Sequence, residues 1–148
     1  MKKLLTLTAL FTMMFSIAQA DVIGVVDFDK VVENYSKVKT VSNEISDKYA
    51  EIQRYSLDKE REYKKLSTPL ERKSFEENVA RELSKKQEAY LKLKEKKEAE
   101  IDAAIKNAIK QVAMTSKVTT VVEKSVVFFG GVDLTDKVVK QLNSPAVK

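Results

Sequence analysis

Carboxylate side chains are the groups in this 148-residue chain whose spacing could support acid–base catalysis or metal binding. Four of them lie close together, at Glu95, Glu98, Glu100 and Asp102. Lysines alternate with these acids, at Lys92, Lys94, Lys96 and Lys97. Opposite charges three or four residues apart stabilise a helix by pairing along its surface. The pattern therefore favours a solvated, ion-paired helix face over a catalytic or metal site.

Other candidates for chemistry are few. The chain contains no cysteine, histidine or tryptophan, which excludes thiol and imidazole nucleophile sets, the usual zinc ligands and disulfides. The Phe-Phe-Gly-Gly segment at 128–131 leads into a predicted helix, as a phosphate-binding loop does, but it lacks the Gly-Lys-Ser/Thr ending of that motif. The Ser, Thr, Lys and carboxylate residues form no recognisable nucleophile–base set. We predict a protein that is not an enzyme and uses no cofactor or metal.

The first twenty residues have the order of a secretory signal peptide. Lys2 and Lys3 give a basic start, residues 4–17 form an apolar stretch, and Ala18-Gln19-Ala20 is a small-residue ending. The apolar stretch is shorter than the roughly 20 residues that a helix needs to cross a bilayer. We predict export and cleavage after Ala20. The mature chain then carries 25 basic and 22 acidic residues, because two of the 27 basic residues lie in the leader.

The middle of the chain is predicted to form a helical hairpin over residues 36–113. Ser67-Thr68-Pro69 interrupts an otherwise Gly- and Pro-free stretch, and a proline after a Ser/Thr cap starts a new helix. This places one helix at 36–66 and a second at 70–113, with the tip near 67–70. At 1.5 Å per residue the two rods reach about 45 and 65 Å, so the arm must project from the rest of the molecule.

Apolar and aromatic residues recur at helical spacing along both predicted rods. Charged residues interrupt this stripe, which predicts a looser seam in the distal half of the arm than at its root. The tyrosines are either residues of the seam or adaptable contacts for unfolded chains. The candidate binding stripe is Tyr49, Ile52, Tyr55, Tyr63, Leu66, Val79, Leu83 and Tyr90.

The tip of the arm carries more basic than acidic residues. The basic residues are Lys59, Arg61, Lys64, Lys65, Arg72 and Lys73, against the acids Glu60, Glu62 and Glu71. Such an excess attracts anionic lipid, lipopolysaccharide or acidic protein segments, but exposed arms are also charged for solubility. Both interpretations stay open. Nucleic acid is not an expected partner, because the arm lacks a dense basic stripe.

A small β-containing base is predicted from both ends of the mature chain, over residues 21–35 and 114–148. Residues 22–28 are predicted to form a strand that leads into a short helix capped by Asp27 or Asp29. The fold class is α+β and mostly α, with the hairpin inserted into a small sheet.

The second half of the base is predicted to contain two strands within residues 118–129, turning near 123–125, because this segment is rich in β-branched and aromatic residues. Two glycines then break the run. Asp133 or Thr135 is expected to cap a final helix that ends near Asn143.

The sequence resembles the Skp/OmpH family of periplasmic chaperones. The resemblance rests on the order of a leader, IGVVD at 23–27, long charged helices, VVEKSVVFF at 121–129 and DLTD at 133–136. It implies a trimer with a shared β body, from which helical arms hang as coiled-coil-like tentacles around a cavity. It also implies that unfolded outer-membrane β-barrel proteins are held there without ATP.

Apolar strands in one small sheet would leave an exposed patch, which trimerisation would bury. The predicted residues of this trimer body are Val22, Val25, Val121, Val126 and Phe128. The alternative function is a structural or adaptor protein whose hairpin binds one folded envelope partner. A polar, interrupted stripe suits loose contacts better than a specific zipper, which favours the chaperone.

Overall fold

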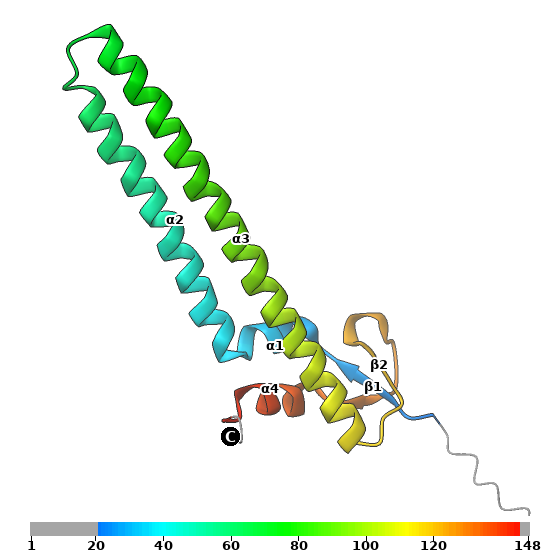
Figure 1. Cartoon of the computed structure of the whole chain (residues 1–148). Coiled ribbons are helices and arrows are strands. Elements are labelled where there is room, and N and C mark those ends of the chain that lie inside the picture. The colour runs from blue at the N-terminus through cyan, green and yellow to red at the C-terminus, as the bar shows by residue number, and fades with distance from the viewer. Residues whose placement is uncertain (1–20, 146–148) are drawn as a thin grey trace, which may run out of the picture.

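A computed structural model describes residues 21–145 and shows a long helical arm projecting from a small body (Figure 1). The predicted α+β, mostly helical fold is confirmed. The predicted signal peptide lies outside the described residues. Within residues 21–145, no helix combines the length and apolar character needed to span a membrane.

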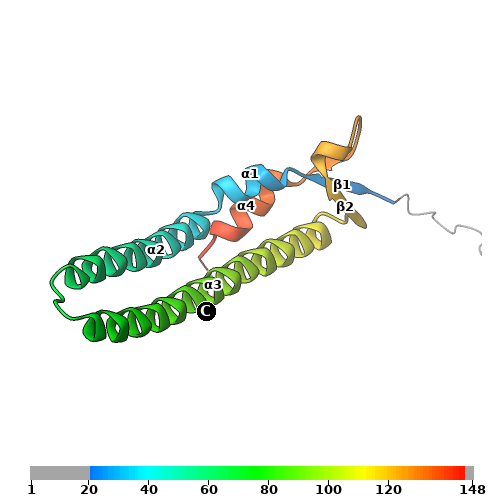
Figure 2. The same ribbon diagram turned by 90° about the horizontal axis from the view of Figure 1, so that it is seen from above.

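The arm consists of α2 (Ser36–Tyr63) and α3 (Pro69–Thr115), which run side by side in both views (Figures 1 and 2). The helices agree with the predicted bounds to within three residues at each end. Thr68 begins α3 through a capping box: its Oγ1 accepts a hydrogen bond from the Glu71 N–H, and the Glu71 carboxylate accepts one from the Thr68 N–H. Arg72 donates two hydrogen bonds to the Leu66 carbonyl, which closes the tip.

The body contains a three-stranded parallel sheet in the order β2-β1-β3. Its strands are β1 (Ile23–Val26), β2 (Thr120–Glu123) and β3 (Val132–Asp133). β1 is the centre of the sheet, so the hairpin is inserted between two neighbouring parallel strands. A parallel pair needs a long crossover connection, and the arm provides it.

The prediction of two strands turning near 123–125 is wrong. Only β2 forms there, and a short 3-10 helix, η1 (Lys124–Val126), follows it directly. The 3-10 turn directly after β2 ends the extended conformation, so residues 127–129 do not continue as a second strand of a hairpin. Gly130 and Gly131, with φ of 87° and 89°, instead carry the chain around to β3.

Two short helices complete the body: α1 (Phe28–Asn34) and α4 (Thr135–Asn143). Asp27, one of the two residues predicted to cap α1, does so by accepting a hydrogen bond from the Lys30 N–H. The predicted N-cap of α4, Asp133 or Thr135, is wrong: Leu134 occupies this position and makes no side-chain cap, although Asp133 just before it accepts a hydrogen bond from the Thr135 N–H at 2.9 Å. The predicted end of this helix at Asn143 is confirmed.

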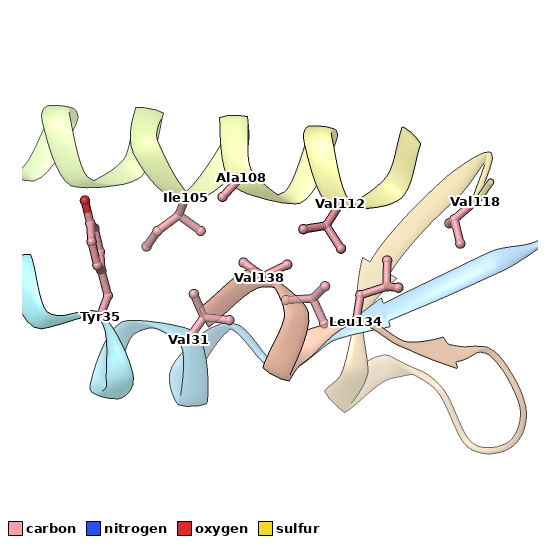
Figure 3. Packing of buried hydrophobic residues seen from close by; sticks show 9 residues of the cluster. Val31, Tyr35, Ile105, Ala108, Val112, Val118, Leu134 and Val138 are labelled. Atoms are coloured by element: carbon pink, nitrogen blue, oxygen red, sulfur yellow. The ribbon is translucent and has the colours of Figure 1, made fainter. Parts of the chain in front are cut away.

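The core lies where α3 passes over α1 and α4. Ile105, Ala108 and Val112 point from α3 toward Val31 and Val138 below (Figure 3). Ile105, Val31 and Val138 are fully buried, whereas the distal half of the arm contributes no residue to this cluster. The arm is therefore anchored most firmly at its root, as the dense apolar stripe there predicts.

Candidate functional site

The acidic residues near the root of α3 form ion pairs along the helix. Lys94 and Glu98 lie 3.8 Å apart, and Lys106 and Asp102 lie 2.7 Å apart. The predicted ion-paired helix face is therefore confirmed for Glu98 and Asp102. Among residues 21–145, no group of three or more acidic, His or Cys side chains is placed to hold a metal ion.

One side of the arm is a charged groove. Its lining is Glu44, Asp47, Lys48, Glu51, Arg54, Tyr55, Asp58, Lys86 and Leu93. Lys86 crosses from α3 to Glu51 of α2 at 3.3 Å, and nearer the root Lys97 reaches Glu44 at 2.8 Å. Hydrogen bonds from Lys48 and Lys86 lower the pKa of Glu51. The interrupting lysines of the stripe thus join the two helices through ion pairs instead of apolar packing.

Lysine–aromatic contacts fill the seam in the distal half. The Lys86 ammonium lies 5.0 Å from the Tyr55 ring centre, and Lys59 lies 5.7 and 5.8 Å from the rings of Tyr55 and Phe75. Cation–π contacts of this kind are worth about 0.5–1 kcal/mol where exposed. They let charged residues occupy positions that a tight coiled coil gives to leucine, so the distal seam holds together loosely.

Three shallow apolar hollows lie along the arm. The root hollow, of about 470 Å³, is lined by Phe28, Val32, Val38, Val41, Ser42, Ile45, Ser46, Tyr90, Lys94, Glu98, Ile101, Asp102 and Ile105. The middle hollow, of about 350 Å³, is lined by Tyr49, Ile52, Gln53, Ser56, Gln87, Tyr90 and Leu91. The distal hollow, of about 380 Å³, is lined by Ser56, Lys59, Glu60, Tyr63, Phe75, Glu76, Val79, Ala80 and Leu83.

The residues of the predicted binding stripe lie in different environments in the structure. Its members in the hollows are Tyr49, Ile52, Tyr63, Val79, Leu83 and Tyr90. Ile52 is only 6% exposed and belongs to the seam, whereas Tyr49 is 51% exposed. Tyr55 instead lines the charged groove. Leu66 is half-buried beside the tip.

Several residues of the hollows were missed by sequence reasoning. Phe75 lies one helical turn before Val79, so extending the stripe by four residues would have found it. Leu91 follows Tyr90 directly but was not included, because it falls beside the stripe. Gln53 and Gln87 are polar, so a search for apolar residues at helical spacing does not find them. Only the packing of α2 against α3 shows that they line the middle hollow.

The basic tip is largely engaged with its own acids. Lys59 pairs with Glu62 and Lys64 with Glu60, each at 2.6 Å. Arg61 lies 3.4 Å from Asp58, and Arg72 binds the Leu66 carbonyl. The tip is therefore a mixed-charge surface instead of a bare basic patch.

The residues predicted to form the trimer body differ in how far they are exposed. Val25 is 5% exposed and belongs to the interior of the subunit. Val121 is half-buried, and Val22 is 39% exposed. Val126 and Phe128 are exposed, together with Phe129, which was not predicted. These last three residues lie between β2 and β3 and give the body an exposed apolar loop.

The fold and its surfaces define a class of protein: a helical hairpin that projects from a small sheet and carries a charged groove and shallow apolar hollows along its length. A family model described as outer membrane protein (OmpH-like) matches residues 22–142, and the chain belongs to this family. The OmpH-like family comprises periplasmic chaperones that bind outer-membrane proteins. The resemblance found in the sequence is thereby confirmed. No curated protein matches the chain.

Proposed function

We propose that the mature chain, beginning at Asp21 after cleavage of its leader, is an ATP-independent periplasmic holdase for unfolded outer-membrane β-barrel proteins. One observation carries the proposal beyond the family: a highly charged projecting arm bears a row of shallow apolar hollows. Such hollows suit exposed apolar segments of an unfolded client. The charged remainder of the arm keeps the loaded chaperone soluble.

The proposed mechanism requires no chemical reaction, because the hollows hold the client through non-covalent contacts. Each of these contacts is weak. Several weak contacts on one client add up through effective concentration and hold it against aggregation. Each contact can also dissociate separately, so the client can leave without an energy source. The cation–π and ion-paired seam of the distal arm allows the two helices to adjust to clients of different shape.

The holdase is proposed to be a homotrimer whose bodies meet through the apolar loop and sheet edge. Phe128 is 107% exposed, Phe129 98% and Val126 69%, which is an unusual surface for an isolated small domain. β2 is an edge strand with one side unpaired in the sheet, and edges of this kind are normally covered. Three arms hanging from a shared body would then enclose a client.

A contact between the tip and anionic lipid or lipopolysaccharide remains a secondary proposal. It depends on the lysines Lys65 and Lys73, since most of the other basic side chains pair with acids of the tip. The double change Lys65→Glu and Lys73→Glu should abolish binding to vesicles containing anionic lipid. It should leave client holding unchanged. Equal vesicle binding by this variant would remove the tip from the mechanism.

The proposed function is tested by diluting a urea-unfolded outer-membrane β-barrel protein into buffer with increasing amounts of the mature chain. Light scattering is recorded without nucleotide. Suppression of scattering that saturates near three chains per client is expected. Undiminished aggregation at large excess would overturn the holdase and direct attention to a single folded envelope partner.

A further inference from the structure

The three apolar hollows are connected to one another along the arm. Tyr90 lines both the root hollow and the middle hollow. Ser56 lines both the middle hollow and the distal hollow. Neighbouring hollows thus lie next to each other, each sharing a side chain with the next, in a row from the root of the arm toward its tip. We call this surface the apolar groove.

The apolar groove and the charged groove lie on opposite sides of the seam. A helix turns about 100° per residue, so Gln53 and Glu51 project to opposite sides of the buried Ile52 between them. Gln53 lines the middle hollow, and Glu51 lines the charged groove. The same separation holds on α3, where Leu91 lines the middle hollow and Leu93 the charged groove.

The two sides differ sharply in charge. Seven of the nine residues that line the charged groove are ionisable acids or bases. The middle hollow contains no acidic or basic residue in its lining. Charged side chains reappear in the apolar groove only in its root and distal hollows. An uncharged, apolar segment is therefore matched better by the middle of the groove than by the charged, opposite side of the arm.

The length of the apolar groove matches one membrane strand of a β-barrel. Along α2 the groove runs from Val38 to Tyr63, a separation of about 38 Å at 1.5 Å per residue. An extended chain covers that distance in about 11 residues at 3.3 Å each. Transmembrane β-strands have about 9–11 residues, with apolar side chains on alternate positions. One side of such a strand is apolar over the whole groove length.

We propose that the apolar groove binds one extended segment of alternating apolar and polar residues, a single unfolded membrane strand of the client. The apolar side chains enter the three hollows, and the alternate polar side chains face solvent. The charged groove turns away from the client. This inference rests on the holdase function, because it identifies which side of the arm performs it.

Two exposed leucines provide a matched pair of variants. Leu91 is 61% exposed and lines the middle hollow, whereas Leu57 is 54% exposed and lies outside all three hollows. Leu91→Lys and Leu57→Lys both add one positive charge at an exposed helical position. Both should fold. Only Leu91→Lys places a charge in the uncharged part of the apolar groove.

The experiment measures how tightly each protein binds a urea-unfolded, fluorescently labelled eight-stranded outer-membrane β-barrel protein. Leu91→Lys should weaken binding about tenfold, the effect of losing one apolar side-chain contact at the centre of the groove. Leu57→Lys should bind as the original protein does. Equal binding by both variants, with the original protein active, would overturn the inference. Failure of the original protein to bind would overturn the holdase itself.

Two further results distinguish the occupant of the groove. Photo-crosslinking from Leu91→p-benzoylphenylalanine should label the client, whereas crosslinking from Leu57→p-benzoylphenylalanine should label it weakly. If Leu91→Lys instead changes the assembly mass measured by light scattering, a second copy of the chain occupies the groove. That result would also overturn the inference.

Discussion

At the scale of single residues, side chains at the carboxyl ends of the strands join the body together. Thr135 Oγ1 accepts a hydrogen bond from the Asp27 N–H at 3.0 Å, and the Glu123 carboxylate accepts from the Phe28 N–H. Asp133 accepts from the Thr135 N–H and pairs with Lys124 at 2.7 Å. Residues about 100 positions apart in sequence are thus connected at the carboxyl end of β1, where α1 and α4 begin.

The carboxyl group of Asp133 makes the stability of the body depend on pH. Hydrogen bonds from Lys124 and Thr135 hold the pKa of its carboxyl well below the ordinary range. The unfolded chain therefore binds this proton more readily, and the stabilisation is present above about pH 4 and lost as the pH falls further. Because the Asp133 side chain is 47% exposed, solvent screening limits the effect to about 1 kcal/mol.

Asp133→Asn should accordingly lower the free energy of unfolding at pH 7 by about 1 kcal/mol. The difference from the original protein should shrink at pH 3, where the carboxyl of the unfolded state is protonated. Urea unfolding at equal protein concentration checks both values. A deficit of the same size at both pH values would mean that the carboxylate charge does not contribute.

Gly24 is the second residue with a specific role, because it lies where two side chains approach the backbone of β1. A Cβ atom there would lie 2.8 Å from Leu134 Cδ1 and 2.9 Å from Val118 Cγ1. Leu134 is fully buried and cannot move aside easily. Gly24→Ala should destabilise the protein by about 1–3 kcal/mol through overpacking. Thermal unfolding with no loss of stability would show that the body adjusts freely.

At the scale of elements, the helices could be predicted far better than the strands. Thr68 and Pro69 are local signals, since a capping box and a first-turn proline act within one helical turn, and they fixed the tip correctly. The apolar segment after Thr120 has high β propensity throughout, yet only β2 pairs with β1, and the chain turns into η1 after Glu123. Which part of the segment forms a strand depends on its pairing with β1, which is distant in sequence, so no local pattern reveals it.

The candidate site shows the same division between local and distant information. The periodic stripe placed Tyr49, Tyr63 and Tyr90 in the seam region, because helical spacing is a local property. It could not separate the apolar groove from the charged groove, and it therefore grouped Tyr55 with residues that lie on the other side of the seam. The side of the seam on which a residue lies depends on how α2 and α3 are rotated against each other.

The capping box at the tip should control how far the arm frays. Thr68→Ala removes the acceptor for the Glu71 N–H and should cost about 1 kcal/mol of local stability. Amide hydrogen exchange in the first turns of α3 should become about fivefold faster, as that energy implies. Ser67→Ala is the matched control, one residue earlier, and should leave exchange unchanged. Equal acceleration in both variants would contradict a specific cap.

The cross-helix ion pairs should contribute modestly to the seam. Lys97 is 22% exposed and Glu44 45%, so their pair at 2.8 Å is partly screened by solvent. A double-mutant cycle with Glu44→Ala and Lys97→Ala should give a coupling free energy of about 0.5 kcal/mol. The coupling should decrease in 1 M salt, where charges are screened over about 3 Å. A coupling that does not respond to salt would indicate packing instead of charge.

At the scale of the whole molecule, the arm and the body have different requirements for stability. The arm is long and charged, and its distal half contributes little to the core. A few buried residues at the root must therefore hold both long helices to the body. A subunit of this shape exposes much of its apolar surface near the sheet. Association of subunits is the most direct way to bury that surface, and it would place the arms side by side.

The exposed apolar loop of the body should therefore decide the assembly state. The double change Phe128→Asp and Phe129→Asp removes apolar contacts worth about 1.5–3 kcal/mol per buried phenylalanine and adds charges to the interface. Sedimentation equilibrium should give three times the subunit mass for the original protein and a mass near that of one subunit for the variant. Leu70→Asp, which alters a leucine that is 76% exposed at the tip, is the control and should remain trimeric.

The same variant separates assembly from client binding. If three arms must surround a client, the double Phe→Asp variant should lose aggregation suppression even though its arms, and the apolar groove on each, are unchanged. Suppression that persists in a single-subunit protein would show that one arm is sufficient and that the body serves another purpose. An original protein that sediments as a single subunit would contradict the trimer directly, because the exposed loop would then need a different partner.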